Sequence, residues 1–111
     1  MAGKFELKKS SSGQFMFNLK AGNGRVVLTS ELYRTKASAQ DSIKAVKKFA
    51  AKGANFERKT SAKGEPFFVL KAANGEIIGT SEMYTSAASM NKGIASVQTH
   101  AQTATLTDLT E

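Results

Sequence analysis

The chain contains no cysteine, no tryptophan, one proline and one histidine in 111 residues. Without cysteine, a disulfide framework and thiolate chemistry are both excluded. A lone histidine cannot supply the ligands of an ordinary zinc site, so we expect no metal and no cofactor. We place His100 at a helix end, where an imidazole suits the helix dipole. With Asp41 and Asp108 as the only aspartates, no Ser-His-Asp arrangement is indicated and we expect no enzyme.

Long apolar runs are also missing. No stretch approaches the roughly 18 apolar residues that a membrane-spanning helix needs. The opening segment MAGKFELKK has no apolar run behind its lysines, unlike a signal peptide. We therefore expect a cytoplasmic protein that does not enter a membrane. The 41% hydrophobic and 23% charged residues are typical of a globular domain.

The net charge of +7 is unevenly distributed. Residues 1–52 hold eleven Lys/Arg and three Asp/Glu, a net charge of +8, whereas residues 53–111 hold five and six, a net charge of −1. A basic half can attract phosphates or acidic proteins. The favoured interpretation is a solvated face that keeps the protein in solution.

The second half of the chain repeats the first at an offset of 51 residues. LKAGNGRVVLTSELY at 19–33 returns as LKAANGEIIGTSEMY at 70–84. Twenty of the 48 positions agree when 3–50 is placed over 54–101, where average composition gives about three. The chain is therefore a tandem duplication. We predict one domain, 1–111, made of repeat one (3–50), repeat two (54–101) and a C-terminal strand or tail (102–111).

Each repeat changes its hydrophobic period once, from two to about 3.6. Alternating apolar residues predict strands over 4–9, 15–21 and 25–32, and over 55–60, 66–72 and 76–83. Asn23-Gly24 predicts a two-residue type I′ turn that sets Ala21 opposite Val26. Thr35 is a plausible N-cap for a helix with an apolar stripe at 39, 43, 46 and 50, and a second helix is expected over about 86–100.

A meander of three strands with one helix leaves its apolar sheet face only partly covered. Two copies related by a pseudo-two-fold axis can share one core, and about 50 residues per copy are marginal alone. The predicted fold is α+β: tandem β-β-β-α repeats forming one mainly antiparallel sheet with both helices on one face. The terminal TATLTDLTE segment predicts an added edge strand or a frayed tail.

These residues carry a family resemblance. The doubled LKAxNGxxxxTSExY pattern, the GIASV segment at 93–97 and the TATLTDLT tail resemble the YegP-like family of small bacterial proteins. The resemblance covers residues 4–110, although repeat one has DSIKAV where repeat two has KGIASV. It implies a bacterial origin and a tandem repeat with exchanged C-terminal strands. The family is of uncharacterised function, so it supplies no catalytic or binding residues.

Candidate binding residues lie on the sheet face turned away from the helices and on the basic repeat one. They are Lys8, Met16, Lys20, Arg25, Val27, Lys59, Phe67, Val69, Lys71 and Ile78. An apolar and basic face can dock a protein partner or, with help from Lys44, stack and neutralise single-stranded nucleic acid. Because Phe67 is the only aromatic residue among them, nucleic acid is the alternative and a plain solvent face is favoured over both.

The segments TSELY (29–33) and TSEMY (80–84) have the same polar residues in both repeats, which calls for an explanation. The favoured interpretation is structural: the hydroxyls satisfy backbone groups where each strand turns toward its helix. The functional interpretation is two symmetric pockets built from Glu31, Tyr33, Glu82 and Tyr84. The sequence thus favours a monomeric, non-enzymatic binding module, a fused pseudo-dimer whose partner is not identified.

Overall fold

The computed structural model describes residues 3–110, which form seven strands, two α-helices and one short 3₁₀ turn. The strands are β1 (Lys4–Lys9), β2 (Phe15–Lys20), β3 (Val26–Thr29), β4 (Phe56–Thr60), β5 (Pro66–Lys71), β6 (Ile77–Thr80) and β7 (Thr105–Asp108). The helices are α1 (Lys36–Phe49) and α2 (Ala87–Thr103), and the 3₁₀ turn η1 spans Gly53–Asn55. Each repeat therefore has the predicted β-β-β-α order.

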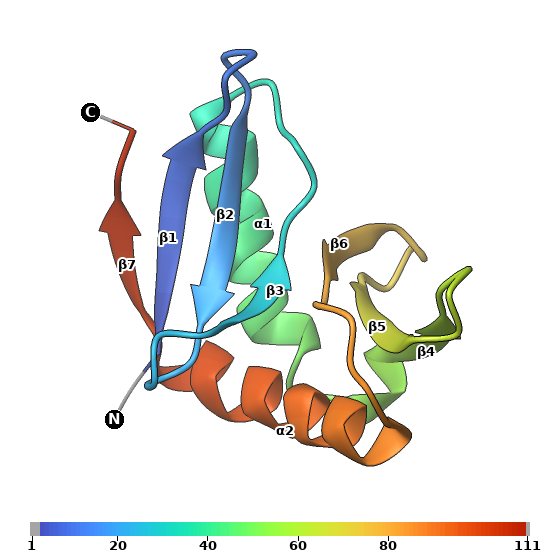
Figure 1. The fold of residues 1–111 in the computed structure, drawn as a ribbon. Coiled ribbons are helices and arrows are strands. Elements are labelled where there is room, and N and C mark those ends of the chain that lie inside the picture. Colours follow the sequence, from blue (N-terminus) through green and yellow to red (C-terminus); the bar gives the residue numbers. More distant parts are fainter. Residues whose placement is uncertain (1–2, 111) are drawn as a thin grey trace.

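All seven strands form one sheet in the order β4-β5-β6-β3-β2-β1-β7 (Figure 1). Neighbouring strands are antiparallel except β7, which runs parallel to β1. The two meanders meet at one pair of residues, Thr29 and Thr80, which hold the same position in the two repeats. The predicted α+β fold is confirmed. The tail is an edge strand that follows α2 of repeat two and pairs with β1 of repeat one.

Both helices begin at hydroxyl caps. The side chains of Thr35 and Ser86 accept hydrogen bonds from backbone N–H groups three residues on, each at 3.1 Å. Helix α2 runs to Thr103, three residues beyond its predicted end, and His100 lies in its last turn. Among residues 3–110, no helix has the length and apolar character required to cross a membrane.

The helices cover one face of the sheet and make a single core. Helix α1 contacts β1 and β2 of its own repeat and also β5 and β6, while α2 contacts β5 and also β2 and β3 (Figure 1). Edge-to-face pairs recur in both repeats, Phe5–Phe17 at 5.8 Å and Phe56–Phe68 at 5.5 Å between ring centroids. Because each helix covers strands of both repeats, much of the apolar burial of either repeat depends on the other.

At the centre of the sheet the two repeats meet with unlike residues. Leu28 and Gly79 hold equivalent positions, and a Cβ atom built on Gly79 would lie 2.6 Å from Cγ of Leu28. Leu28 is fully buried, so its side chain fills the space that a side chain at position 79 would need. A leucine in both repeats would place two side chains in one volume.

The β2–β3 turn differs from the prediction. Ala21 N–H donates to the carbonyl of Arg25, and Gly24 N–H donates to the carbonyl of Ala21, each at 2.9 Å. Within this turn Gly24 has a positive φ, of 84°, and Asn23 does not. This is a three-residue loop with a left-handed glycine, so Ala21 faces Arg25 and not Val26. The Asn23 side chain favours this loop over the two-residue turn because it accepts the N–H of Arg25 at 3.0 Å.

Candidate functional site

The strand-to-helix corners use their hydroxyl groups structurally. Ser30 Oγ accepts the N–H of Phe17 at 2.9 Å and donates to the carbonyl of Glu31 at 2.8 Å. Ser81 makes the equivalent bonds to Phe68 and the carbonyl of Glu82 at the same distances. Each hydroxyl thus takes the place of one backbone acceptor at the ends of β3 and β6, while the N–H groups of Ser30 and Ser81 still donate to the carbonyls of Phe17 and Phe68. Strand β6 ends at Thr80 and not at residue 83.

The two tyrosines of these corners have different surroundings. The Tyr33 hydroxyl is hydrogen-bonded to Ser42 Oγ of α1 at 2.7 Å. The residue equivalent to Ser42 is Gly93, and a Cβ built there would lie 2.1 Å from the Tyr84 hydroxyl. Tyr84 therefore lies directly over the helix backbone, stacked on Phe68 with 6.2 Å between ring centroids. Its hydroxyl makes no hydrogen bond with the described residues.

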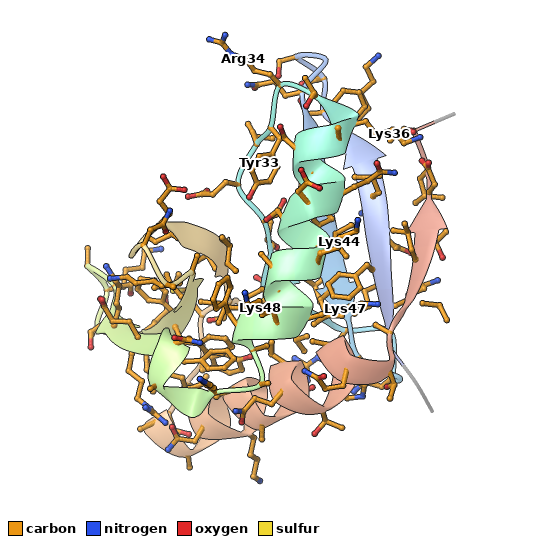
Figure 2. The ribbon with its side chains drawn as sticks, turned by 180° about the vertical axis from the view of Figure 1, so that it is seen from behind. Tyr33, Arg34, Lys36, Lys44, Lys47 and Lys48 are labelled. Atoms are coloured by element: carbon orange, nitrogen blue, oxygen red, sulfur yellow. The ribbon has the colours of Figure 1, made fainter. Side chains whose placement is uncertain are left out.

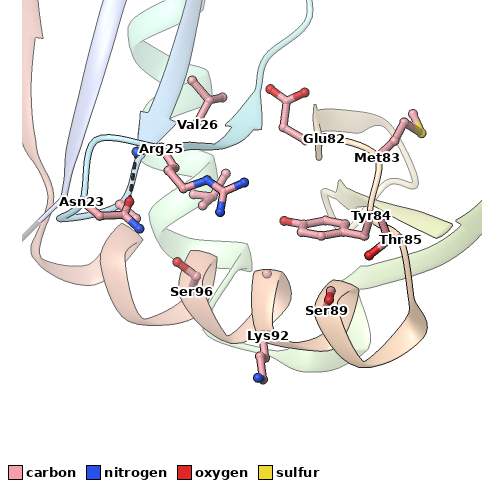
Figure 3. Close-up of a pocket in the computed structure, with 13 residues that line it drawn as sticks. Asn23, Arg25, Val26, Glu82, Met83, Tyr84, Thr85, Ser89, Lys92 and Ser96 are labelled. Atoms are coloured by element: carbon pink, nitrogen blue, oxygen red, sulfur yellow. Dashed lines mark hydrogen bonds between the residues drawn. The ribbon is translucent and has the colours of Figure 1, made fainter. Parts of the chain in front are cut away.

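A cleft of about 510 Å³ opens beside Tyr84, between the two repeats. Its walls come from the β2–β3 hairpin of repeat one, the second corner, and α2. The lining residues are Ala21, Asn23, Arg25, Val26, Val27, Glu82, Met83, Tyr84, Thr85, Ser89, Lys92, Gly93 and Ser96. Figure 3 shows the Arg25 guanidinium and the Tyr84 hydroxyl pointing toward one another across it. The Lys92 ammonium points away, so Lys92 contributes its stem and a more distant positive charge.

The cleft holds charged groups of both signs, Arg25 and Glu82, that are not paired with each other. The Arg25 guanidinium forms no ion pair or hydrogen bond with residues 3–110. Burial, with a further contribution from the Glu82 carboxylate, raises the pKa of the Tyr84 hydroxyl, while Arg25 opposes this rise. The phenol is therefore a neutral hydrogen-bond donor at neutral pH.

The open sheet face pairs most of its charges internally. Glu6 is 7% exposed and lies within 3.6 Å of the ammonium groups of Lys4, Lys8 and Lys20. Hydrogen bonds from Lys20 outweigh burial and lower the pKa of Glu6. In repeat two, Glu57 accepts from Lys71 at 2.6 Å and lies 3.8 Å from Lys59. A second hollow beside β4 is lined by this already neutralised Glu57–Lys71 pair.

Three residues expected on this face as exposed contacts are buried. Val27, Val69 and Ile78 have exposed fractions of 8%, 3% and 7%. Val27 and Ile78 pack in the hydrophobic core cluster, and Val69 lies on a central strand between β4 and β6. The expectation that they are exposed is wrong because each lies on an inner strand with a neighbouring strand on both sides, and β-bulges follow residue 19 in β2 and residue 70 in β5. Met16 and Phe67 are half-buried.

Part of the basic character of repeat one lies on α1, which carries Lys36, Lys44, Lys47 and Lys48 (Figure 2). Lys44, Lys47 and Lys48 are exposed along it. The ammonium of Lys47 lies 5.8 Å from the Phe5 ring centroid, and that of Lys48 lies 5.3 Å from the Phe49 ring centroid. These two side chains cover aromatic rings in addition to facing water.

The structure brings together some of the predicted site residues. Arg25 and Val27 share the cleft with Glu82 and Tyr84, although they were predicted in separate groups. Tyr33 instead bonds to Ser42, so the two corners are not symmetric pockets. No group of three or more potential metal ligands occurs in residues 3–110.

Sequence reasoning missed the floor of the cleft, which α2 supplies through Ser89, Gly93 and Ser96. The signal for Gly93 was available in the repeat itself. Position 93 differs from its partner Ser42, whereas the tyrosine that packs on it is identical in both copies. A position that differs between the repeats, next to one that is identical, therefore indicates where the structures of the two repeats differ.

Comparisons with known proteins agree with this architecture. A family described as Domain of unknown function (DUF1508) matches residues 10–57 and again 61–108. The chain is 50% identical to the UPF0339 protein YegP of Escherichia coli K12 over 99% of this chain and 100% of that protein. It is 48% identical to a UPF0339 protein of Acinetobacter baylyi over 99% of each chain.

Two solution NMR structures have the same fold. One is a UPF0339 protein of Shewanella oneidensis, with a TM-score of 0.93, 48% identity and coverage of 99% of this chain and 93% of that one. The other is YegP of E. coli, described as a protein of unknown function, with a TM-score of 0.94, 50% identity and coverage of 99% and 95%. The chain therefore belongs to the DUF1508 family, as a YegP-like protein with two tandem copies of the domain.

Proposed function

We propose that this protein is a non-enzymatic binding module that takes a small ligand in the cleft between its repeats. One observation carries the proposal: the Arg25 guanidinium and the Tyr84 hydroxyl, neither of them paired within residues 3–110, face each other across about 510 Å³ of space. Ligand sites are typically concave, of 300–1,000 Å³, with apolar walls and a few convergent polar groups. Val26, Val27 and Met83 supply apolar wall here.

Binding is favoured over catalysis by the geometry of the single histidine. His100 Nδ1 lies 2.8 Å from the carbonyl oxygen of Ser96 and 3.1 Å from its hydroxyl. A carbonyl oxygen can only accept, so Nδ1 carries the proton and cannot remove one from the Ser96 hydroxyl. The one serine of the cleft that contacts a histidine therefore has no base there.

NMR titration tests this proposal. We expect at least one of phenol, benzylamine and benzoate to shift the backbone amides of Arg25, Tyr84 and Gly93 in a saturable way. Ser96→Leu, which fills the cleft from α2, should abolish those shifts. Ala95→Leu, on the exposed side of the same turn, should leave them unchanged. Cleft amides that respond to none of the three compounds would overturn the proposal.

The sheet face remains the alternative site, for a protein partner or for single-stranded nucleic acid. Its lysines already pair with Glu6 and Glu57, which leaves less positive charge for phosphates. Fluorescence anisotropy with a labelled oligo(dT) at 50 mM salt should therefore show no binding. Saturable binding that is lost in Phe67→Glu would favour the sheet face instead.

We also propose that the protein acts as a monomer, since each repeat already covers the apolar face that the other would expose. Size-exclusion chromatography with light scattering should give the mass of one chain, and the mass of two chains would contradict this. The cytoplasmic location expected from the sequence stays a prediction.

A further inference from the structure

The two repeats carry opposite charges at the positions that flank the cleft. Arg25 follows the β2–β3 turn, and Glu76 holds the equivalent place after the β5–β6 turn. Both turns have the same hydrogen bond, because Asn23 accepts the N–H of Arg25 and Asn74 accepts the N–H of Glu76, each at 3.0 Å. The two turns differ in charge at one position, 25 in repeat one and 76 in repeat two, and in size at another, where Gly22 corresponds to Ala73.

Helix positions show the same inversion. Lys92 on α2 corresponds to Asp41 on α1, both exposed. Among the residues that line the cleft beside Tyr84 are Arg25, Lys92, Glu82 and the neutral Thr85. The equivalent residues in the other repeat are Glu76, Asp41, Glu31 and the cation Arg34. At these positions the surroundings of Tyr84 have a net charge of +1, which includes the Lys92 ammonium that points away from the cleft, and those of Tyr33 have a net charge of −2.

The tyrosine hydroxyls of the two repeats also differ in their hydrogen bonding. The Tyr33 hydroxyl is bonded to Ser42, but the Tyr84 hydroxyl has no partner among the described residues. Gly93 causes this difference, because it removes the side chain that would have bonded the phenol. In repeat one the tyrosine hydroxyl is bonded to the helix, whereas in repeat two it is free and directed into a cleft together with the Arg25 guanidinium.

We infer that the cleft binds one small organic anion, a carboxylate or a phosphate monoester, held by the Arg25 guanidinium and the Tyr84 hydroxyl. The inference rests on the proposed function and specifies its ligand class. A guanidinium presents N–H groups in a fork that matches two oxygens of such an anion. The carboxylate of Glu82 also lines the cleft and repels anions, so it favours a ligand with no more than one anionic group. The apolar part of the ligand would lie against Val26 and Met83.

The test uses ligands that differ in charge on one ring. Phenyl phosphate and benzoate should shift the amides of Arg25, Tyr84 and Gly93 saturably, whereas benzylamine should not. Arg25→Gln should weaken the binding of phenyl phosphate at least about tenfold, the loss expected for a charge-assisted hydrogen bond. Tyr84→Phe should weaken it by a smaller factor. Affinity should also fall as salt is raised, since Arg25 is exposed.

Matched controls come from the other repeat. Glu76→Gln and Tyr33→Phe change the equivalent side chains and should leave the affinity within twofold of the starting protein. Unchanged spectra outside the cleft show that each variant is folded. If phenol or benzylamine binds in the cleft and the anions do not, the ligand class is wrong while the binding function stands. If Arg25→Gln binds phenyl phosphate as well as the starting protein, the anion inference is overturned. If none of the compounds binds, both proposals fall.

Discussion

Ser30→Ala tests the structural role of the repeated TSExY segment. Ser30 is 7% exposed, and its hydroxyl accepts the N–H of Phe17 and donates to the Glu31 carbonyl. Alanine would leave the Phe17 N–H unpaired beside a fully buried ring. A buried donor without a partner costs about 1–3 kcal/mol. That is a large share of the roughly 5–15 kcal/mol that holds a small domain folded.

Urea denaturation followed by circular dichroism measures this loss. With a slope of about 1–2 kcal/mol per molar urea, a loss of about 2 kcal/mol lowers the midpoint by about 1–2 M without changing the slope. Ser81→Ala should behave alike, because Ser81 makes the same bonds to Phe68 and Glu82. Ser11→Ala, at an exposed loop position, is the control and should stay within about 0.5 kcal/mol. If Ser30→Ala costs no more than Ser11→Ala, the corner hydroxyls do not stabilise the fold as argued.

Three further predictions concern the core, the edge strand and the halves. Gly79→Ala brings a methyl group against Leu28 and should lower the free energy of unfolding by about 1–3 kcal/mol, measured by urea denaturation. In the double variant with Leu28→Ala this loss should be smaller, because the side chain that the methyl group meets is gone. Losses that simply add in the double variant would contradict the contact. Hydrogen bonds from Lys36 lower the pKa of Asp108 to about 2, below its unfolded value. The stabilisation is therefore complete above about pH 4 and lost toward pH 2. The protection of β7 amides from hydrogen exchange, measured relative to the intrinsic rate at each pH, should fall over that range, and Asp108→Asn should remove the change. Residues 54–111 alone should be unfolded by circular dichroism, and a stable folded monomer would refute a shared core.

Much of the fold follows from residues that the repeat makes visible. Identical positions such as Phe17 and Phe68 mark the strand faces, and the change of period after Tyr33 marks the helix, because local periodicity is written in consecutive residues. The turn at Asn23 was assigned to the wrong class, since Asn-Gly permits either loop and a side-chain hydrogen bond decides between them. Periodicity also does not say how tightly a strand is enclosed by its neighbours, so Val69 was expected to be exposed.

The candidate site was the least predictable part. The cleft depends on Arg25 from one repeat approaching Tyr84 from the other, and no local pattern encodes that distance. Both residues were named as candidates from the sequence, but in different groups. What joins them is the packing of α2 across strands of repeat one. Positions where the copies differ, such as Gly93, carry the information that the identical positions lack.

The pair formed by Leu28 and Gly79 makes the two repeats non-interchangeable at the centre of the sheet. A chain built from two first repeats would force two leucines into the space for one, and a chain built from two second repeats would leave a void of leucine size at the axis. The two halves are therefore complementary in shape at this point, and neither is complementary to itself. Either half should therefore pair with a copy of itself less well than with the other half, so the present duplication is asymmetric in its packing.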